Sequence, residues 1–314
     1  MDNYKGLKIN MTAQIIQTKN DMHFNFFSLP KIPLPKKVLM VTPTYFNIDN
    51  PINAHMLNAE GKPHTLDTIK ANEQWNTLKF VYQKLNLDLF ILEGVEHLPD
   101  MVFCANQSLP YLDKENRTLA FLSNMQNDIR QKEVEHIDVF LKSQKYNTQT
   151  ITKRTINTSF EGMGDVAWLG QIRFMLGGYG YRTDKNIYPL LSAATDTPIA
   201  IFELKNPKFY HLDTCLSVLN STTALVCKEA FTTEGFQLLE AIFPRLLQVP
   251  LKEADAPGFA CNAHCPDEKH VIIQKGNKKT LELIQQHNFI PIEVETSEFI
   301  KSGGSVYCMK LMFF

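Results

Sequence analysis

The sequence contains no run of apolar residues long enough to cross a lipid bilayer. A spanning helix needs about 18 to 20 consecutive apolar residues, and no stretch of the 314 residues approaches that length. The first twenty residues are polar and lack the apolar core of a secretory signal peptide. We therefore expect a cytoplasmic protein without a membrane as partner.

An excess of charge of either sign is also missing. The chain has 32 lysines and arginines against 33 aspartates and glutamates, which gives a formal net charge of -1. Proteins that bind nucleic acid electrostatically carry basic patches or a strongly basic balance. The charge balance gives no reason to expect nucleic acid as a partner.

Cysteine is scarce for a fold held by disulfides, with six residues spread widely along the chain. Without an export signal we expect free thiols in a reducing compartment. The segment "CNAHC" offers an alternative, because Cys261, His264, Cys265 and the nearby His270 resemble part of a zinc site. No second Cys/His pair follows at finger spacing. We therefore predict no metal ligand.

Long Gly/Ser-rich or Pro-rich linkers are absent from the body of the chain, which favours a single domain. Residues 1–35 are predicted to be an N-terminal extension. Residues 24–37 carry three prolines, which exclude a regular helix, and three phenylalanines there are expected to hold the extension against the body. Residues 36–314 are predicted to form one domain.

Short apolar strands alternate with helical stretches along this body. Strands are predicted at 37–42, 87–92, 117–122, 166–169, 172–176, 215–219, 224–227, 270–274, 289–295 and 306–313. Helices are predicted at 66–85, 131–143, 186–194, 233–243 and 279–287. The order indicates an α/β protein of roughly five strand-strand-helix-strand units, each of about 50 to 60 residues.

Two acidic segments stand where predicted elements end, which is where functional side chains concentrate. In "FYHLDTCLSVL", an extended strand would turn His211 and Asp213 to the same face. They suit a general acid/base with a binding carboxylate, or a surface histidine near a turn. In "FEGMGDVAWLG", Glu161 and Asp165 flank two glycines. They suit a cationic substrate, or a solvated acidic turn.

Two glycine-rich segments are further candidates. In "MLGGYGYRTD", three glycines precede Arg182. This segment could cradle a phosphate, but it lacks the lysine of a P-loop, and an arginine bound to a carboxylate fits at least as well. At the C-terminus, Gly303 and Gly304 form a loop that delivers Cys308 at or beside a strand. Cys308 is then a nucleophile or an ordinary buried thiol.

The order of these segments resembles the amidinotransferase, or pentein, superfamily. That group includes dimethylargininases, arginine deiminases, arginine dihydrolases and glycine amidinotransferases. The resemblance covers roughly residues 37–314 and implies a five-bladed α/β propeller of pseudo-symmetric ββαβ units around a central active site. It is carried by "MVTPTYFNIDNPINAHM", "DMVFCANQ", "FEGMGD", "GGYGYRTD", "FYHLDTCLSVL", "FACNAHC" and "SEFIKSGGSVYCMKL".

The resemblance also implies three catalytic roles. Cys308 matches the nucleophile, which attacks the guanidinium carbon of an arginine-like substrate to form a covalent thiouronium intermediate. His211 matches the general acid/base. Glu161 matches the acidic residue that binds the guanidinium and supports the histidine. No metal or organic cofactor is implied.

Further positions match substrate-binding residues of the family. Asp213 matches a carboxylate that contacts the guanidinium, and Arg182 the arginine that grips the α-carboxylate. Arg130 lies near a second substrate-contacting arginine, after an apparent insertion. Asp165, in the acidic segment, completes the predicted substrate-binding set together with Asn53 and Asn106.

One position departs from part of the family. Arginine deiminases and dimethylargininases have Asp where this chain has Asn106, and Asn106 together with Asn53 resembles the arginine dihydrolase branch. That branch hydrolyses twice and releases ornithine, carbon dioxide and two ammonia molecules. We therefore expect a small guanidino substrate. For partners of the same chain, the expectation includes both a monomer and a homo-oligomer. The alternatives are a dimethylargininase-like hydrolase, an amidinotransferase, or a non-catalytic pentein, which the retained cysteine, histidine and glutamate disfavour.

Overall fold

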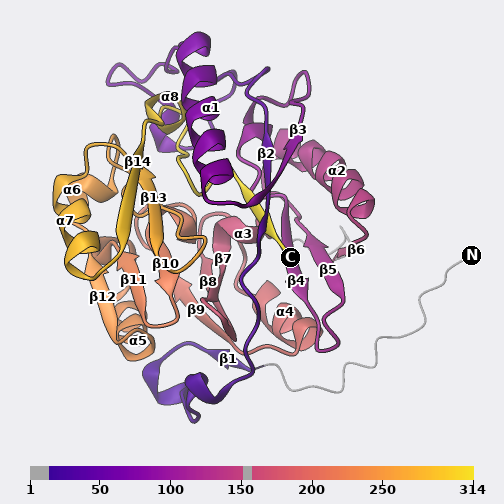
Figure 1. Cartoon of the computed structure of the whole chain (residues 1–314), viewed down its shortest axis with the longest axis vertical. Coiled ribbons are helices and arrows are strands. Elements are labelled where there is room, and N and C mark those ends of the chain that lie inside the picture. The colour runs from indigo at the N-terminus through magenta and orange to yellow at the C-terminus, as the bar shows by residue number, and fades with distance from the viewer. Residues whose placement is uncertain (1–13, 151–157) are drawn as a thin grey trace, which may run out of the picture.

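The computed structural model describes residues 14–150 and 158–314 (Figure 1). The described residues form five separate β-sheets, and each has two free edges, so that no sheet closes on itself. This is a mixed α/β fold, as predicted. The first part of the predicted extension, residues 1–13, lies outside the described residues.

Three of the sheets share one element order, in which an antiparallel strand pair is followed by a helix and a strand parallel to the second. The first has β4 (Ser108–Leu112), β5 (Thr118–Leu122), α2 (Asp128–Ser143) and β6 (Asn147–Thr150). The second has β7 (Val166–Leu169), β8 (Ile172–Tyr179), α4 (Ile187–Thr195) and β9 (Ile199–Glu203). The third has β10 (Leu216–Asn220), β11 (Thr223–Val226), α5 (Thr233–Ile242) and β12 (Arg245–Gln248).

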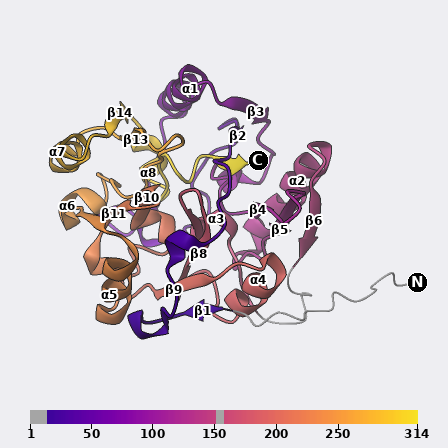
Figure 2. The same ribbon diagram turned by 60° about the horizontal axis from the view of Figure 1, so that its bottom comes forward.

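The other two sheets vary this order. One pairs two parallel strands across a helix: β13 (His270–Gln274), α7 (Lys278–Gln286) and β14 (Ile290–Val294). The last contains β2 (Lys37–Val41), α1 (Thr68–Lys84), β3 (Asp88–Leu92) and the C-terminal β15 (Leu311–Phe313). Because β15 pairs antiparallel with β2, the end of the chain joins its first long strand. Figure 2 shows the long helices at the periphery and the strands towards the middle.

Helix α2 illustrates how local sequence positions a site residue. Asn127 caps the helix, because its side chain accepts from the backbone N–H groups of Ile129 and Arg130, an interaction that contributes about 1 kcal/mol. The helix buries Ile137 and Leu141 in the core, and its buried face also carries Arg130. The cap and the apolar face together turn this arginine inward.

The described part of the extension is attached to the body. Strand β1 (Ile15–Ile16) pairs parallel with β9. The rings of Phe24 and Phe26 lie 6.4 and 5.9 Å from that of Phe174, whereas Phe27 is 44% exposed. Between Phe24 and the first long strand there is only a 3-10 turn, as the prolines require.

The structure corrects the prediction at the C-terminus, where residues 306–310 are not a strand and only Leu311–Phe313 pair. Five strands were not predicted. These are the two-residue β1 in the extension, β4, which contains a proline, the polar β6, and β9 and β12. No helix in the described ranges is long and apolar enough to span a membrane.

Candidate active site

Distant segments meet at a cavity that contains Cys308, which we call the Cys308 cavity. Five of the nine predicted site residues line it: Asn53, Asn106, Arg130, Arg182 and Cys308. The other lining residues are Ile52, Met56, Asp100, Phe103, Tyr210 and Ser302. The remaining four predicted residues are buried and lie next to this set or to one another.

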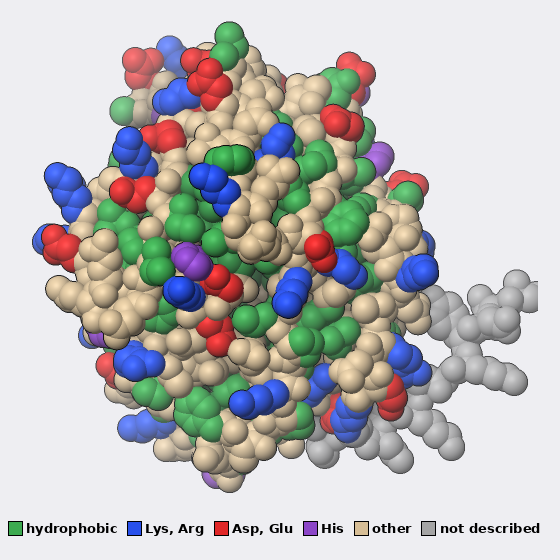
Figure 3. Space-filling model, viewed as in Figure 1, with side chains coloured by type: hydrophobic (Ala, Val, Ile, Leu, Met, Phe, Trp, Pro, Cys, Tyr) green, Lys and Arg blue, Asp and Glu red, His purple; other side chains and the backbone are tan. Residues whose placement is uncertain are grey.

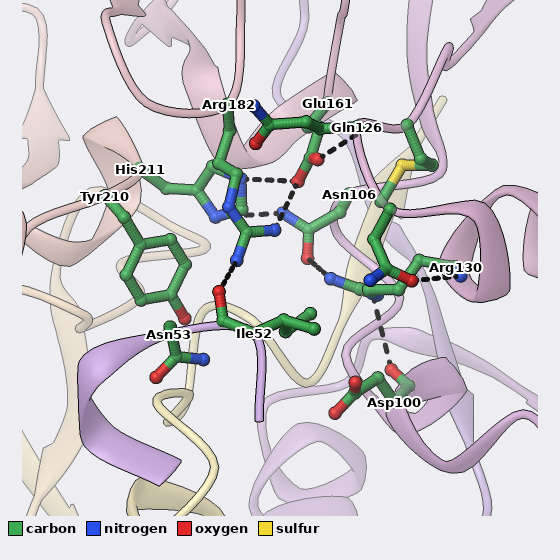
Figure 4. A network of polar contacts seen from close by, with 12 residues as sticks. Ile52, Asn53, Asp100, Asn106, Gln126, Arg130, Glu161, Arg182, Tyr210 and His211 are labelled. Atoms are coloured by element: carbon green, nitrogen blue, oxygen red, sulfur yellow. Dashed lines mark hydrogen bonds and ion pairs between the residues drawn. The ribbon is translucent and has the colours of Figure 1, made fainter. Parts of the chain in front are cut away.

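His211 and Glu161 form a buried pair (Figure 4). The distance between His211 Nε2 and Glu161 Oε2 is 2.7 Å. His211 and Asp213 do not lie on an extended strand, because His211 immediately precedes a 3-10 turn, η5 (Leu212–Thr214). Asp213 lies within that turn and contacts Cys308, so that one short segment supplies side chains to two parts of the site.

Glu161 keeps its charge despite its burial. Burial alone would raise its pKa, but the hydrogen bond and charge of His211, together with Arg182 and Arg130, lower the pKa to about 2. The other carboxylate oxygen accepts from the backbone N–H of Gln126 at 3.2 Å. Glu161 is therefore an anion that can orient His211.

Asn106 lies on the other side of the imidazole. Its Oδ1 accepts a hydrogen bond from Arg130 at 3.2 Å, which places its Nδ2 towards His211, 3.4 Å from Nδ1. An amide nitrogen can only donate, so Nδ1 of His211 must be the accepting nitrogen and Nε2 carries the proton shared with Glu161. Arg130 and Asn106 thus determine which ring nitrogen of His211 faces the amide and which faces Glu161.

The two glycines of "EGMGD" allow this close arrangement. Gly162 has a positive φ of 50°, which disfavours any other residue. A Cβ atom on Gly164 would lie 2.1 Å from Asn106 Nδ2 and 3.4 Å from His211 Cδ2. The glycines therefore make room for the amide and the imidazole, in the short helix α3 (Gly162–Asp165).

The Cys308 thiol is 3% exposed and has two polar neighbours. It donates to Asp213 Oδ2 at 3.3 Å and accepts from Asn262 Nδ2 at 3.2 Å. Burial and the charge of Asp213 raise the pKa of the thiol well above its ordinary value. Burial likewise raises the pKa of Asp213 to about 7. The thiol is therefore protonated at neutral pH as the structure stands.

Asn262 holds the loop that carries the thiol, and the sequence analysis missed it. Its Oδ1 accepts from the backbone N–H groups of Ser305, Tyr307 and Cys308 at 3.1 to 3.3 Å. Its Nδ2 also donates to the backbone oxygen of Asp213 at 2.9 Å. Asn262 belongs to the segment "CNAHC", in which only the cysteines and the histidine were considered as functional residues.

Arg182 lines the same cavity as Cys308. Its Nη1 is 3.4 Å from Glu161 Oε2, and its Nη2 donates to the backbone oxygen of Ile52 at 2.9 Å. The guanidinium also lies over the ring of Tyr210, 5.0 Å from the centroid. Tyr210 was not predicted. Its position next to His211 in the chain was the signal available.

The remaining predicted residues have structural contacts of their own. Asp165 Oδ1 accepts from the backbone N–H of Leu212 at 3.0 Å, and its Oδ2 lies 3.9 Å from His211 Nε2. Burial raises the pKa of Asp165 to about 7. Asn53 Nδ2 donates to the backbone oxygen of Ser302 at 3.0 Å, which joins two walls of the cavity.

Two alternatives from the sequence have no support in the geometry. His264 Nδ1 pairs with the hydroxyl of Tyr82 at 3.1 Å, and no group of three or more His, Cys, Asp or Glu side chains in the described ranges could hold a metal ion. Gly177 and Gly178 lie inside β8, where a Cβ atom would clash with Tyr188 and Leu212. They serve packing in a strand instead of forming a phosphate loop.

Comparisons with known proteins agree with this site. The family model of "N,N dimethylarginine dimethylhydrolase, eukaryotic" matches residues 42–314. The chain is 31% identical to the N(G),N(G)-dimethylarginine dimethylaminohydrolase of Mycobacterium tuberculosis over 90% of this chain and 87% of that protein. It is 29% identical to the bifunctional arginine dihydrolase/ornithine cyclodeaminase ArgZ of Synechocystis sp., over 88% of this chain but 37% of that longer protein.

Solved structures of related enzymes have the same fold as this chain. The N-terminal domain of ArgZ, an arginine dihydrolase of cyanobacteria bound to its substrate, superposes with a TM-score of 0.80 at 26% identity. The superposition covers 88% of this chain and 97% of that domain. The predicted superfamily and the predicted cysteine-dependent hydrolase of guanidino C–N bonds are confirmed. The chain belongs to the N,N dimethylarginine dimethylhydrolase family, within the pentein or amidinotransferase superfamily.

Proposed function

We propose that this protein is an arginine dihydrolase, which hydrolyses arginine twice to ornithine, carbon dioxide and two ammonia molecules. The observation that carries the proposal is Asn106, an amide held between Arg130 and His211. A carboxylate there would attract a second proton to His211 and a full cation to the site. An amide does neither, so the site suits a neutral ureido intermediate as well as a guanidinium.

Cys308 is the nucleophile in this proposal. Burial raises the pKa of its thiol, so a bound guanidinium is needed to favour the thiolate. The thiolate attacks the guanidinium carbon, ammonia leaves, and a thiouronium joins carbon and sulfur. Water then releases the ureido product and restores the thiol.

His211 moves the protons. Glu161 stabilises the imidazolium that forms when Nδ1 takes a proton, in the way that a buried carboxylate supports a catalytic histidine. Nδ1 accepts the thiol proton, passes it to the leaving nitrogen, and then accepts a proton from the attacking water. Such acid/base help contributes typically about 10²- to 10⁴-fold.

The substrate-binding roles combine residues that line the Cys308 cavity with Glu161, Asp213 and Asp165, which lie next to it. Glu161 and Asp213 bind the planar cation. Arg182 has N–H donors beyond those that contact Glu161 and the backbone oxygen of Ile52, and these suit the α-carboxylate. Asn53 and Asp165 complete the binding set, while Arg130 acts through Asn106, because most of its donors face Glu133 and backbone oxygens.

A second candidate is a dimethylargininase-like hydrolase. It is favoured by the family model that matches residues 42–314, which is that of a dimethylarginine dimethylhydrolase. In this case one hydrolysis releases dimethylamine and leaves citrulline. Transfer of the amidino group to an acceptor amine, as in amidinotransferases, would use the same thiouronium.

Several broader predictions belong to the same proposal. We take the five sheets to be the blades of a pentein propeller, with the final strand β15 completing the blade of β2 and β3. We keep residues 1–35 as an extension and 36–314 as one catalytic domain. A cytoplasmic location and a homo-oligomer also stay predictions; light scattering of the purified protein determines the latter.

The deciding experiment is a substrate panel with products read by mass spectrometry. The purified protein is mixed separately with arginine, asymmetric dimethylarginine and citrulline. A dihydrolase forms ornithine from both arginine and citrulline. Citrulline as the final product from arginine, with no reaction of added citrulline, would contradict the dihydrolase. Preferential turnover of dimethylarginine would favour the second candidate.

A further inference from the structure

Helix α2 carries a buried ion pair, between Glu133 and Arg130 three positions before it. Charged side chains ordinarily lie at the surface, as Figure 3 shows for both signs on one face of the molecule. Glu133, by contrast, is 0% exposed and Arg130 only 4%. Arg130 lines the Cys308 cavity and Glu133 does not. The carboxylate is therefore placed to act on the site through the arginine.

Glu133 holds the guanidinium of Arg130 at two nitrogen atoms. Nε donates to Glu133 Oε1 at 3.3 Å and Nη2 to Glu133 Oε2 at 3.0 Å, a paired contact that fixes the direction of the guanidinium as well as its position. Nη2 also donates to the backbone oxygens of Asp100 and Phe103, at 3.3 and 2.9 Å. These contacts leave Nη1 as the nitrogen that donates to Asn106.

Gln107 anchors the carboxylate in turn. Its Nε2 donates to Glu133 Oε2 at 2.5 Å and to the backbone oxygen of Phe103 at 3.2 Å. Gln107 follows Asn106 directly in the chain. The segment that carries the amide therefore also fixes the carboxylate that holds Arg130.

The buried pair has a cost in stability. Burial raises the pKa of Glu133 to about 7, although Arg130 acts in the opposite direction, so the contribution of Glu133 to stability is lost as pH rises through this range. Burial acts to lower the pKa of Arg130, but neighbouring carboxylates, above all Glu133, raise it above its ordinary value. Buried ion pairs are often no more stabilising than apolar side chains of similar volume. Stability alone therefore does not explain this pair.

The contacts of the pair determine how the Asn106 amide is turned (Figure 4). The oxygen and the nitrogen of an amide are nearly equal in shape, so hydrogen-bond partners decide which of its two orientations is adopted. A guanidinium can only donate. Arg130 Nη1, at 3.2 Å from Asn106 Oδ1, therefore selects the orientation that presents Nδ2 to His211. This selection requires that Nη1 stays in place.

We propose that Glu133 is a positioning residue for the hydrolysis, which fixes the orientation of the Asn106 amide through Arg130. Without this carboxylate the long side chain of Arg130 regains rotamer freedom, and its charge is drawn towards Glu161, which already acts on it. The amide then loses its fixed donor. The inference rests on the role proposed for Asn106, but not on the number of hydrolyses, because the amide faces His211 in either case.

The test is the change Glu133→Gln in two backgrounds, with kcat and KM measured for arginine, or for asymmetric dimethylarginine if that is the substrate turned over. In the parent, kcat should fall at least about tenfold and KM should change less, because a misplaced catalytic group can cost about 10²-fold. In Asn106→Asp the two carboxylate oxygens are equivalent and there is no amide to orient. The same change should there lower kcat less than about threefold.

Glu253→Gln is the matched control. Glu253 lies in α6 (Leu251–Ala254), outside the candidate site, and accepts from the backbone N–H groups of Lys279 and Thr280. Its loss should leave kcat unchanged in both backgrounds. Circular dichroism establishes that each variant is folded. The proposal is overturned if folded Glu133→Gln has the kcat of the parent, or if its loss is equally large in Asn106→Asp.

A second variant keeps the test decisive if Glu133→Gln does not fold. Gln107→Leu removes the donor to Glu133 Oε2 and leaves the ion pair in place. We expect a smaller fall in kcat, of about threefold, in the parent and none in Asn106→Asp. An equal effect in the two backgrounds would contradict the proposal. An inactive parent, with either substrate, would instead contradict the proposed function.

Discussion

Asn106 and His211 are joined through the nitrogen atom of the amide, which lies 3.4 Å from the imidazole Nδ1. Arg130 fixes this orientation because it donates to the amide oxygen. A polar chain therefore runs from Arg130 through Asn106 and His211 to Glu161, with Arg182 at its far end (Figure 4). The chain places the amide nitrogen of Asn106 at Nδ1 of His211 and the carboxylate of Glu161 at Nε2.

The change Asn106→Asp should separate the two hydrolyses. A carboxylate accepts from both Arg130 and a protonated His211, so it favours the imidazolium. We expect hydrolysis of citrulline to fall at least about tenfold relative to that of arginine, because the second round needs the neutral base. Product analysis with each substrate measures this ratio. An unchanged ratio in a folded variant would remove the role we give to the amide.

Asn262 should matter for the position and the ionisation of the thiol. Asn262→Ala removes three acceptor contacts to the backbone of residues 305–308, and we expect kcat to fall about 10²-fold through misplacement of Cys308. Asn262→Asp keeps the acceptor but places a carboxylate beside the thiol, which should raise its pKa. The rate of thiol alkylation against pH separates the two effects. Equal alkylation profiles for parent and Asn262→Asp would contradict this assignment.

Gly164→Ala tests the close packing at the centre of the site. The new methyl group would lie 2.1 Å from Asn106 Nδ2, so the amide must move, at a cost of about 1 to 3 kcal/mol. We expect both the free energy of unfolding and kcat to fall. Gly235→Ala in α5 is the matched control, because its methyl group comes no closer than 3.2 Å to any atom, at Thr232 Oγ1, and otherwise meets carbon atoms at 3.9 Å. Loss of activity in the control alone would be inconsistent with this explanation.

The pKa of Asp213 predicts a pH dependence of stability. Burial raises this pKa from 3.8 to about 7, so between these values the unfolded chain ionises the residue while the folded protein keeps it protonated. Its contribution to stability is therefore lost as pH rises through this interval, by an amount on the order of a few kcal/mol.

Asp213→Asn should remove that loss. Urea unfolding at about pH 5 and about pH 8 should show the variant gaining stability over the parent at the higher pH. The same change at the exposed Asp88 should not alter the pH dependence of the parent. A constant difference between parent and Asp213→Asn at both pH values would show that Asp213 has an ordinary pKa.

The sequence predicted those elements whose signals are local. Strands β2, β10 and β13 are short apolar runs, and α1 and α5 have helical periodicity, so their side chains alone indicate them. By contrast, β6 has the sequence NTQT and pairs only at the edge of a sheet. Its conformation comes from the neighbouring strand and not from its own residues.

The residues of the candidate site likewise differ in whether the sequence around them could reveal their role. Family resemblance pointed to Cys308, His211 and Glu161, since their surrounding segments are distinctive. It gave no sign of Asn262, whose importance lies in contacts with a loop more than forty residues away in the chain. Lys310 was likewise unmarked, because a lysine is ordinarily exposed, whereas this one is fully buried beside the ring of Tyr307.

The central claim is that the sulfur of Cys308 bonds to the guanidinium carbon of the substrate. Acid quenching during turnover of arginine, followed by mass spectrometry of the proteolytic peptides, tests it most directly. The account predicts an adduct of substrate on the peptide that contains Cys308, and its absence in Cys308→Ala, which should be folded and inactive. Full turnover by Cys308→Ala, or an adduct on any of the other five cysteines in its place, would contradict it.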